Sequence, residues 1–202
     1  MEKRGKLEVI TGCMFSGKTK RITEIIAKQK FPRQPECCKP STDDRGGPNV
    51  INTHEGQQVL VKTIPAQKPE EIFNACHLHW HNTERRQLII IDEAQFFSEK
   101  IVDVVQLLIK WSHHIIVVGL DLDFRGEPFG SMPQLMSFAD KITKLTATCA
   151  VCGQKANRTQ RIINGEPAHY EDRLVLIGGS DKYEARCLKH HIVVGKLEIV
   201  FS

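Results

Sequence analysis

The chain has 202 residues, of which 41% are hydrophobic and 26% are charged, and its formal net charge is +4 at pH 7. This length suffices for one good core with a small appendage and excludes two full-sized domains. No apolar run approaches a membrane span, no signal-peptide segment begins the chain, and no Lys/Arg stripe marks a dedicated nucleic-acid binder. We therefore expect a cytoplasmic protein whose seven cysteines are reduced and whose partner is neither a membrane nor a nucleic acid.

The first predicted strand, Leu7–Thr11, runs directly into a complete G-x-x-x-x-G-K-[ST] motif. Its glycines bring backbone N–H groups against phosphate oxygens, its lysine supplies charge, and its threonine can bind Mg²⁺. Helix formers follow at Lys20–Lys30, so the loop ends at a helix N-terminus. The residues predicted to bind the phosphates are Gly12, Cys13, Met14, Phe15, Ser16, Gly17, Lys18 and Thr19.

Strands and helices alternate along the rest of the first 148 residues. The prolines of Phe31–Pro40 make that segment a poor central strand. The remaining predicted helices are Glu70–His79, Ile101–Trp111 and Met132–Phe138, and the predicted buried strands are Leu88–Ile91, Ile115–Gly119 and Ile142–Thr148. This alternation predicts an α/β fold, a mostly parallel sheet flanked by helices, with ligands at the carboxyl ends of the strands.

An acidic pair, Asp92 and Glu93, ends the apolar run Leu88–Ile91. We assign Asp92 to Mg²⁺ and Glu93 to general-base catalysis, within a nucleotide-binding segment that continues through Ala94 and Gln95. Two functions remain open at this point. Glu93 could orient water in an ATPase acting on nucleic acid, or it could deprotonate the hydroxyl of a small-molecule substrate. Because such motors need a second ATPase domain or a ring, the length of the chain favours the kinase.

The pattern changes after Thr148 to short polar segments, so we place a domain boundary between residues 1–148 and 149–202. Two ligand pairs lie in the second domain, one C-x-x-C and one C-x-x-H. Their spacing predicts one structural Zn²⁺ site closed by four protein ligands. His191 competes with His190 for the fourth position. The predicted ligands are Cys149, Cys152, Cys187 and His190.

Together these residues resemble the cellular, type II thymidine kinases, and the match runs in order over most of the chain. The family-specific strings are Gly12–Thr19, Asp92–Phe97, Gly119–Asp121, Phe124–Phe129, Lys144–Ala147 and Ile177–Tyr183. The resemblance implies transfer of the γ-phosphoryl group of ATP to the 5′-hydroxyl of thymidine or deoxyuridine, with Mg²⁺ and with Glu93 as the base. It also implies a homotetramer and inhibition by dTTP.

The same resemblance implies a "lasso" loop between Cys152 and Cys187 that closes over the nucleoside, with Zn²⁺ fixing its ends. The implied thymidine-binding residues are Met14, Phe96, Leu120, Phe124, Phe129, Thr159, Leu174, Gly178 and Tyr183. Either Arg125 or Arg161 neutralises the transferring phosphate. The chain departs from the family pattern at residues 31–50, where Gly46 and Gly47 replace an aromatic residue.

Overall fold

A six-stranded sheet forms the centre of the molecule in the computed structural model, which describes residues 4–28, 34–42, 50–52, 58–78, 86–174 and 182–197. Its strand order is β5-β2-β6-β7-β1-β8, and every neighbouring pair is parallel. The strands are β1 (Lys6–Thr11), β2 (Glu36–Pro40), β5 (Lys62–Ile64), β6 (Leu88–Ile91), β7 (His114–Gly119) and β8 (Lys141–Lys144). The predicted α/β class with a mostly parallel sheet is confirmed.

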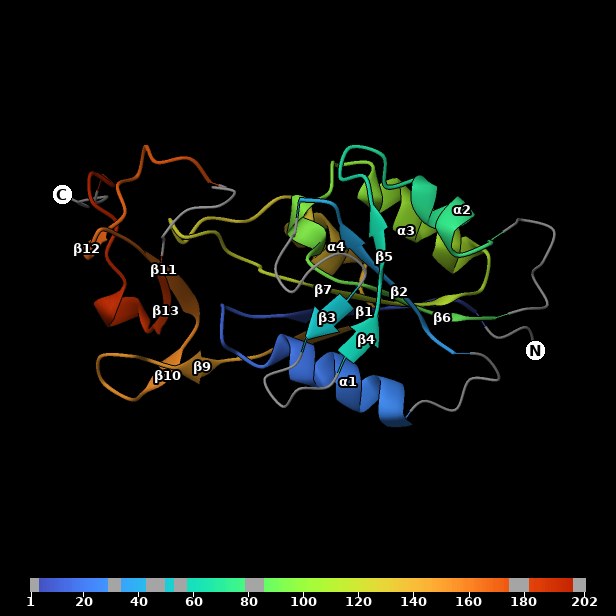
Figure 1. Ribbon diagram of the computed structural model, residues 1–202, viewed down its shortest axis with the longest axis horizontal. Coiled ribbons are helices and arrows are strands. Elements are labelled where there is room, and N and C mark those ends of the chain that lie inside the picture. The colour runs from blue at the N-terminus through green and yellow to red at the C-terminus, as the bar shows by residue number, and fades with distance from the viewer. Residues whose placement is uncertain are drawn as a thin grey trace.

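Helices cover both faces of this sheet (Figure 1). They are α1 (Lys18–Lys28), α2 (Glu71–Ala75), α3 (Ile101–Lys110) and α4 (Met132–Phe138). Helix α1 packs on one face, and α2, α3 and α4 pack on the other. The helix predicted over Glu70–His79 is shorter than expected, because α2 ends at Ala75. Within the described ranges, no helix has the length and apolar character needed to cross a membrane.

The central strand β6 shows why this sheet can be predicted from apolar runs. Ile89 and Ile91 face the core beneath α2, α3 and α4, whereas Leu88 and Ile90 face the core beneath α1. Each of these side chains is at most 2% exposed. A strand covered on both faces has no polar side, so its sequence is continuously apolar. Burial of each such side chain contributes about 1.5–3 kcal/mol to folding.

Strand β2 corrects one expectation, because Glu36–Pro40 lies inside the sheet between β5 and β6. The prolines at its two ends do not interrupt the pairing. Pro35 precedes the strand, and Pro40 is its last residue. The register to β6 ends at Cys38, so the missing N–H of Pro40 has no β6 residue opposite it.

The prediction of a buried strand over Ile142–Thr148 is wrong in two respects. Strand β8 lies at the edge of the sheet and pairs only with β1, and Ile142 is 46% exposed. Ala147–Thr148 forms a separate strand, β9, which pairs with β10 (Lys155–Ala156). An edge strand needs no second apolar face, which accounts for the lysines at both ends of β8.

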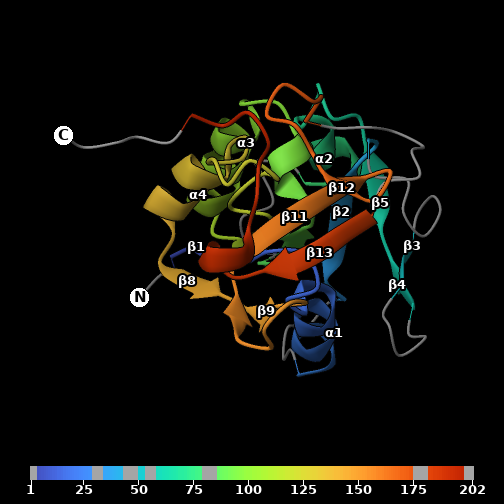
Figure 2. The ribbon, with the colours of Figure 1, turned by 90° about the vertical axis from the view of Figure 1, so that its left-hand side faces the viewer.

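The C-terminal part consists of small antiparallel ladders. Strands β12 (Glu166–Pro167), β11 (Arg158–Ile163) and β13 (Lys182–Arg186) form a three-stranded sheet, followed by a 3-10 helix, η2 (Leu188–His190). Figure 2 shows β11 and β13 side by side. This part lies at one end of the molecule, beyond the carboxyl ends of the parallel strands (Figure 1). A further hairpin, β3 (Val50–Asn52) with β4 (Gln58–Leu60), belongs to the N-terminal part.

Candidate active site and metal cluster

The loop between β1 and α1 has the backbone that a phosphate-binding loop requires. Gly12 and Gly17 have φ values of 146° and 85°, and Phe15 also has a positive φ of 65°. Lys18 begins α1, and its Nζ donates to the carbonyl oxygens of Gly12 and Cys13 at 2.9 Å each. The ammonium group and the helix N-terminus therefore lie together at this loop, which gives it a positive potential suited to phosphate.

Ser16 supplies a second polar group to the loop. Its Oγ is buried and has no hydrogen-bond partner among the residues that the structure describes. A buried hydroxyl without a partner costs free energy, and an anion in the loop would give it one. The loop is thus suited in charge and hydrogen bonding to the phosphates of a nucleotide.

The acidic pair lies where β6 ends. The Asp92 side chain is 7% exposed, and its Oδ1 accepts the N–H of Glu93 at 2.9 Å. Glu93 has φ 50° and ψ 40°, a left-handed conformation that costs a non-glycine residue about 1–2 kcal/mol. It leads directly into a 3-10 helix, η1 (Ala94–Phe96). Such strain persists only where the surrounding structure holds it, and it is concentrated at functional sites.

A further acidic residue, Asp121, follows β7 and was not among the predicted site residues. It is 6% exposed, accepts from the Thr11 hydroxyl at 3.1 Å and forms an ion pair with Lys144 Nζ at 2.6 Å. It thereby joins the carboxyl ends of β1, β7 and β8. Its position directly after an apolar strand was the signal that could have identified it, because ligands of parallel sheets bind at that edge.

Aromatic side chains gather near the same edge. The rings of Phe96 and Phe129 meet edge to face with centroids 5.5 Å apart. Phe124 is 5% exposed, and the guanidinium groups of Arg125 and Arg161 lie 5.4 and 5.2 Å from its ring centroid. The aromatic rings bury apolar surface against each other, and the two guanidinium groups are attracted to the face of the Phe124 ring. The three phenylalanines predicted for the nucleoside pocket thus belong to neighbouring segments after β6 and β7.

The C-terminal part contacts the phosphate loop directly. The N–H of Met14 donates to Thr159 Oγ1 at 3.0 Å. Cys13 packs in a small buried cluster with Cys149 and Ala156, and its thiol lies 3.4 Å from the Ala156 carbonyl oxygen. Burial raises the pKa of the Cys13 thiol, so it stays protonated and acts as a packing residue. Two consecutive residues of the loop are therefore held by the C-terminal strands.

Sequence comparison identifies the family that carries this arrangement. A family model described as thymidine kinase matches residues 5–191. The chain belongs to the thymidine kinase family. The thymidine kinase of Coprothermobacter proteolyticus (strain ATCC 35245 / DSM 5265 / OCM 4 / BT) is 43% identical over 199 residues, which cover 98% of this chain and 96% of that protein. The family predicted from the motifs is confirmed.

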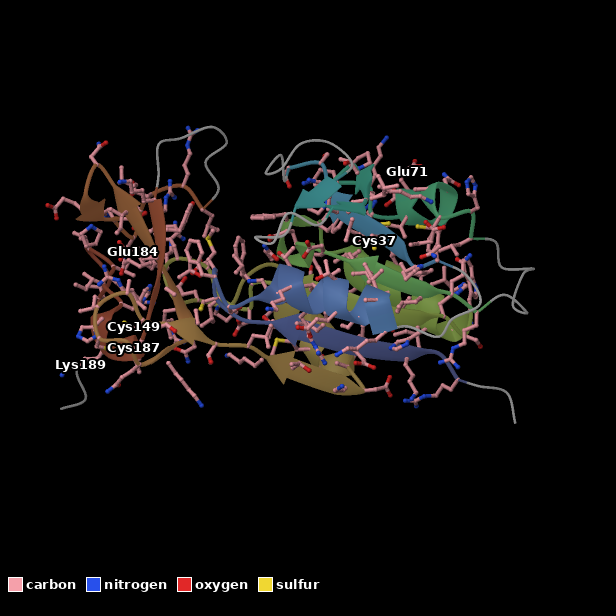
Figure 3. All side chains as sticks on the ribbon, turned by 60° about the horizontal axis from the view of Figure 1, so that its bottom comes forward. Cys37, Glu71, Cys149, Glu184, Cys187 and Lys189 are labelled. Atoms are coloured by element: carbon pink, nitrogen blue, oxygen red, sulfur yellow. The ribbon has the colours of Figure 1, made fainter. Side chains whose placement is uncertain are left out.

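In this thymidine kinase family member, the four predicted zinc ligands come together in the C-terminal part, where Figure 3 labels Cys149 and Cys187. Their ligand atoms lie within 4.8 Å of one another. The Cys152 and Cys187 sulfurs are 3.8 Å apart, and so are Cys149 Sγ and His190 Nδ1. Zn–S bonds of about 2.3 Å in a tetrahedron give an edge of about 3.8 Å. The donor set and its spacing therefore fit Zn²⁺.

The chemistry of Cys149 also fits a metal ligand. Desolvation raises the pKa of this thiol, but backbone hydrogen bonds from Cys187, Cys152 and Val151 outweigh it and lower the pKa to about 5. The thiolate is the form of cysteine that binds metal. A backbone arranged to stabilise a thiolate at this position is consistent with the geometric fit.

The structure separates the two histidines that the sequence left open. His190 Nδ1 lies 3.2 Å from Cys187 Sγ, within the cluster. His191 Nε2 lies 2.8 Å from the carbonyl oxygen of Phe124 in the other part of the chain. Because consecutive residues point in different directions, only His190 shares the site with the cysteines.

The two arginines that remained alternatives for the phosphate both have structural partners. Arg125 Nη2 donates to the Asp172 carbonyl oxygen at 2.8 Å. Arg161 is fully buried, and its Nη1 donates to the Arg173 carbonyl oxygen at 2.5 Å. Both side chains thereby connect the backbone of Asp172 and Arg173 with the Phe124 ring.

Two further predicted thymidine-binding residues, Thr159 and Tyr183, lie on β11 and β13. Tyr183 pairs with Arg161, which is two residues from Thr159, so these three side chains share one face of the sheet. Through Thr159 this is the face that meets the phosphate loop. Leu174 is 40% exposed. Gly178 lies outside the described residues.

Proposed function

We propose that this chain transfers the γ-phosphoryl group of ATP to the 5′-hydroxyl of thymidine, giving dTMP and ADP. Membership of the thymidine kinase family is the observation that carries this proposal. The geometry supports it, because the phosphate loop after β1 and the acidic pair after β6 flank β7 in the sheet. Three neighbouring strands thus bring a phosphate site and a carboxylate to one edge.

We propose that Glu93 is the general base. It accepts the proton of the 5′-hydroxyl as that oxygen bonds to the γ-phosphorus, and the bond from the γ-phosphorus to the bridging oxygen of ADP breaks. Lys18 and the backbone N–H groups of the loop stabilise the phosphate charge as it shifts to ADP. Phe96, Phe124 and Phe129 bury the thymine ring, and Leu120 and Tyr183 complete the pocket.

Thr19 and Asp92 would hold Mg²⁺, which supplies charge neutralisation between the phosphates when it is bound. Their hydroxyl and carboxylate oxygens are the hard donors that Mg²⁺ prefers. Asp92 stands at the carboxyl end of β6 and is held there by the Glu93 N–H. The donor chemistry of these two residues therefore fits the ion.

The decisive assay is ADP release with Mg²⁺ and ATP in the presence of candidate acceptors. Thymidine and deoxyuridine should be phosphorylated, and deoxycytidine and purine deoxynucleosides should remain nearly untouched. Single-stranded DNA and RNA form the matched comparison, because an ATPase acting on nucleic acid was the alternative. Turnover that responds to the polynucleotide and not to thymidine would overturn the proposal in favour of that alternative.

We further propose that residues 149–202 act as a zinc-held module whose loop closes over the nucleoside, on the 1–148 nucleotide-binding domain. The four ligands flank the segment that contains Thr159, Leu174 and Tyr183. Fixing the two ends of a long loop reduces the entropy that nucleoside binding must otherwise overcome. This gives the metal a positioning role and leaves the chemistry to the other domain.

We also propose a homotetramer inhibited by dTTP, on the basis of the family resemblance. The thymine and deoxyribose of dTTP would occupy the nucleoside pocket while its phosphates extend to the phosphate loop. Light scattering at micromolar concentration, with and without dTTP, should give about four chains per particle. A particle of one chain under both conditions would contradict the assembly, and thymidine turnover unaffected by millimolar dTTP would contradict the inhibition.

A further inference from the structure

Gln95 forms hydrogen bonds through both ends of its side-chain amide. Its Nε2 donates to Glu93 Oε2 at 2.5 Å, and its Oε1 accepts the N–H of Leu120 at 3.0 Å. The amide orientation is fixed by chemistry, because the Leu120 N–H can only donate and must face the oxygen. The NH₂ group therefore faces the carboxylate of Glu93. One side chain connects the end of β6 with the end of β7.

Two glycines leave room for Gln95, Gly119 for its side chain and Gly130 for its backbone. A Cβ on Gly119 would lie 2.5 Å from Gln95 Oε1, and a Cβ on Gly130 would lie 2.3 Å from the Gln95 carbonyl oxygen. Separations below about 3 Å do not occur in real packing, so any side chain at either position would displace Gln95. Gln95 itself is 3% exposed. The glycines thus leave the space that Gln95 fills, and its two hydrogen bonds fix its side-chain amide within that space.

The hydrogen bond from Gln95 orients the Glu93 side chain, which the backbone conformation of Glu93 does not do alone. Its left-handed φ of 50° sets where the side chain starts, but the backbone does not set the three side-chain torsions. A charge-assisted hydrogen bond from a buried, immobile amide restricts those torsions before substrate arrives. Restricting the base in advance lowers the barrier, because less freedom is lost in the transition state.

We propose that Gln95 is a positioning residue that holds the carboxylate of Glu93 in the orientation for deprotonating the 5′-hydroxyl. It also fixes Glu93 relative to Leu120, a wall of the proposed thymidine pocket. This inference rests on the proposed function, since it assigns Gln95 a role through the general base. It changes the role expected from sequence, where Gln95 stood among the nucleotide-binding residues.

The test compares Gln95→Met, which keeps the length and loses both hydrogen bonds, with Gln134→Met, whose side chain is exposed on α4. We expect Gln95→Met to lower kcat for thymidine about 10- to 100-fold with both KM values within about 3-fold. Gln134→Met should match the wild type. A role in ATP binding would instead raise the KM for ATP, and wild-type kcat in folded Gln95→Met would overturn the proposal.

A double-mutant cycle with Glu93→Gln separates positioning from stability. If Gln95 acts through Glu93, the double variant should be no slower than Glu93→Gln alone. Independent losses that multiply would show a role that does not pass through Glu93 and would reject the proposal. Wild-type turnover of thymidine is the internal control: its absence rejects the proposed function together with this inference, whereas its presence leaves Gln95 alone under test.

Gln95→Glu adds a readout that a merely structural role would not change. Its carboxylate would stand against that of Glu93, and two carboxylates at that distance cannot both be ionised at neutral pH. We expect its kcat to rise with pH over a higher range than that of the wild type, while Gln95→Met stays low across the range. A Gln95→Glu profile that overlays the wild-type profile would show that the two side chains are not in contact during turnover.

Discussion

Among single residues, Glu93 combines a strained backbone with a position at the carboxyl edge of the sheet, where β7 separates it from the phosphate loop. Its left-handed conformation follows a strand and precedes a 3-10 helix, so no regular element requires it. Because the Asp92 carboxylate accepts its N–H, the strain is held by the neighbouring residue. This conformation distinguishes Glu93 from the other acidic residues of the segment and supports its assignment as the base.

Glu93→Gln should lower kcat about 100-fold or more, with ATP and thymidine affinities little changed. The amide keeps the size of the side chain and loses the ability to accept the proton. Steady-state kinetics and equilibrium binding measure the two effects separately. Glu99→Gln, at an exposed position nearby, is the matched control and should behave as the wild type. An undiminished kcat in Glu93→Gln would leave Glu93 with a positioning role only.

Titration of His113 should make the free energy of unfolding depend on pH. Burial lowers its pKa from the ordinary value near 6.5, and its Nδ1 accepts the Gln87 N–H at 3.3 Å. The folded state thus binds fewer protons than the unfolded state. The stabilisation is present above about pH 6.5 and is lost as the pH falls through the lower, folded-state pKa.

Urea unfolding at pH values from 7.5 down to 5.5 tests this linkage. His113→Gln, which cannot titrate, should show a smaller loss of unfolding free energy with acid than the wild type. His77→Asn, at an exposed position, should keep the wild-type slope. Burial lowers the pKa of His114 and of His191 as well, so part of the slope remains in every variant. Equal slopes for wild type and His113→Gln would contradict the assignment.

At the scale of elements, the phosphate loop contains two glycines with different constraints. Both have positive φ, but a Cβ on Gly12 would lie 2.4 Å from the Leu145 carbonyl oxygen, while no atom lies within 4 Å of a Cβ on Gly17. Gly12 is therefore confined by the backbone that follows β8. A Cβ on Gly17 would meet none of the described residues, so only its positive φ constrains this position.

Gly12→Ala should lower the melting temperature more than Gly17→Ala, because both introduce strain and only the first also forces backbone atoms together. Gly17→Ala should fold and lose affinity for ATP, since a side chain disfavours the positive φ that aims the backbone N–H groups of the loop. Thermal unfolding and ATP titration measure these two outcomes. Equal melting temperatures, or unchanged ATP affinity in Gly17→Ala, would contradict this division.

At the scale of the whole molecule, the metal cluster and the phosphate loop share one buried group of side chains. Cys149, a predicted zinc ligand, packs with Cys13 of the loop, and Thr159 bonds to Met14. Loss of the metal would therefore free the nucleoside loop and also loosen one wall of the phosphate loop. The core beneath β6 and β7 contains none of these residues and would keep its packing.

Metal analysis should find about one zinc per chain. His190→Ala should lose the metal, and His191→Ala should retain it, since His191 contacts Phe124. Cys152→Ser should raise the KM for thymidine more than the KM for ATP, because the loop must then be ordered by the nucleoside. Full thymidine affinity in zinc-free protein would contradict the proposed role of the module. Equal zinc loss in the two histidine variants would contradict the ligand assignment.

Features that depend on contiguous residues could be predicted without the structure. The phosphate loop, the strand Leu88–Ile91, the acidic pair and the two ligand pairs could each be identified because their chemistry lies within a few positions. Helix ends were less definite, since α2 stops at Ala75 without a marked breaker. The prediction for Glu36–Pro40 was wrong for a related reason. Proline is excluded from a strand only at positions whose N–H must form a ladder hydrogen bond, and those positions depend on the register with the neighbouring strands.

Only the tertiary structure decided the contacts between distant segments. The assignment of His190 depends on where η2 directs two consecutive side chains. The role of Asp121 depends on Thr11 and Lys144, and that of Gln95 depends on Leu120. These contacts are made possible by the parallel order of β6, β7, β1 and β8. A sequence pattern records periodicity along one element, whereas hydrogen bonds at the carboxyl ends of a sheet are made between elements.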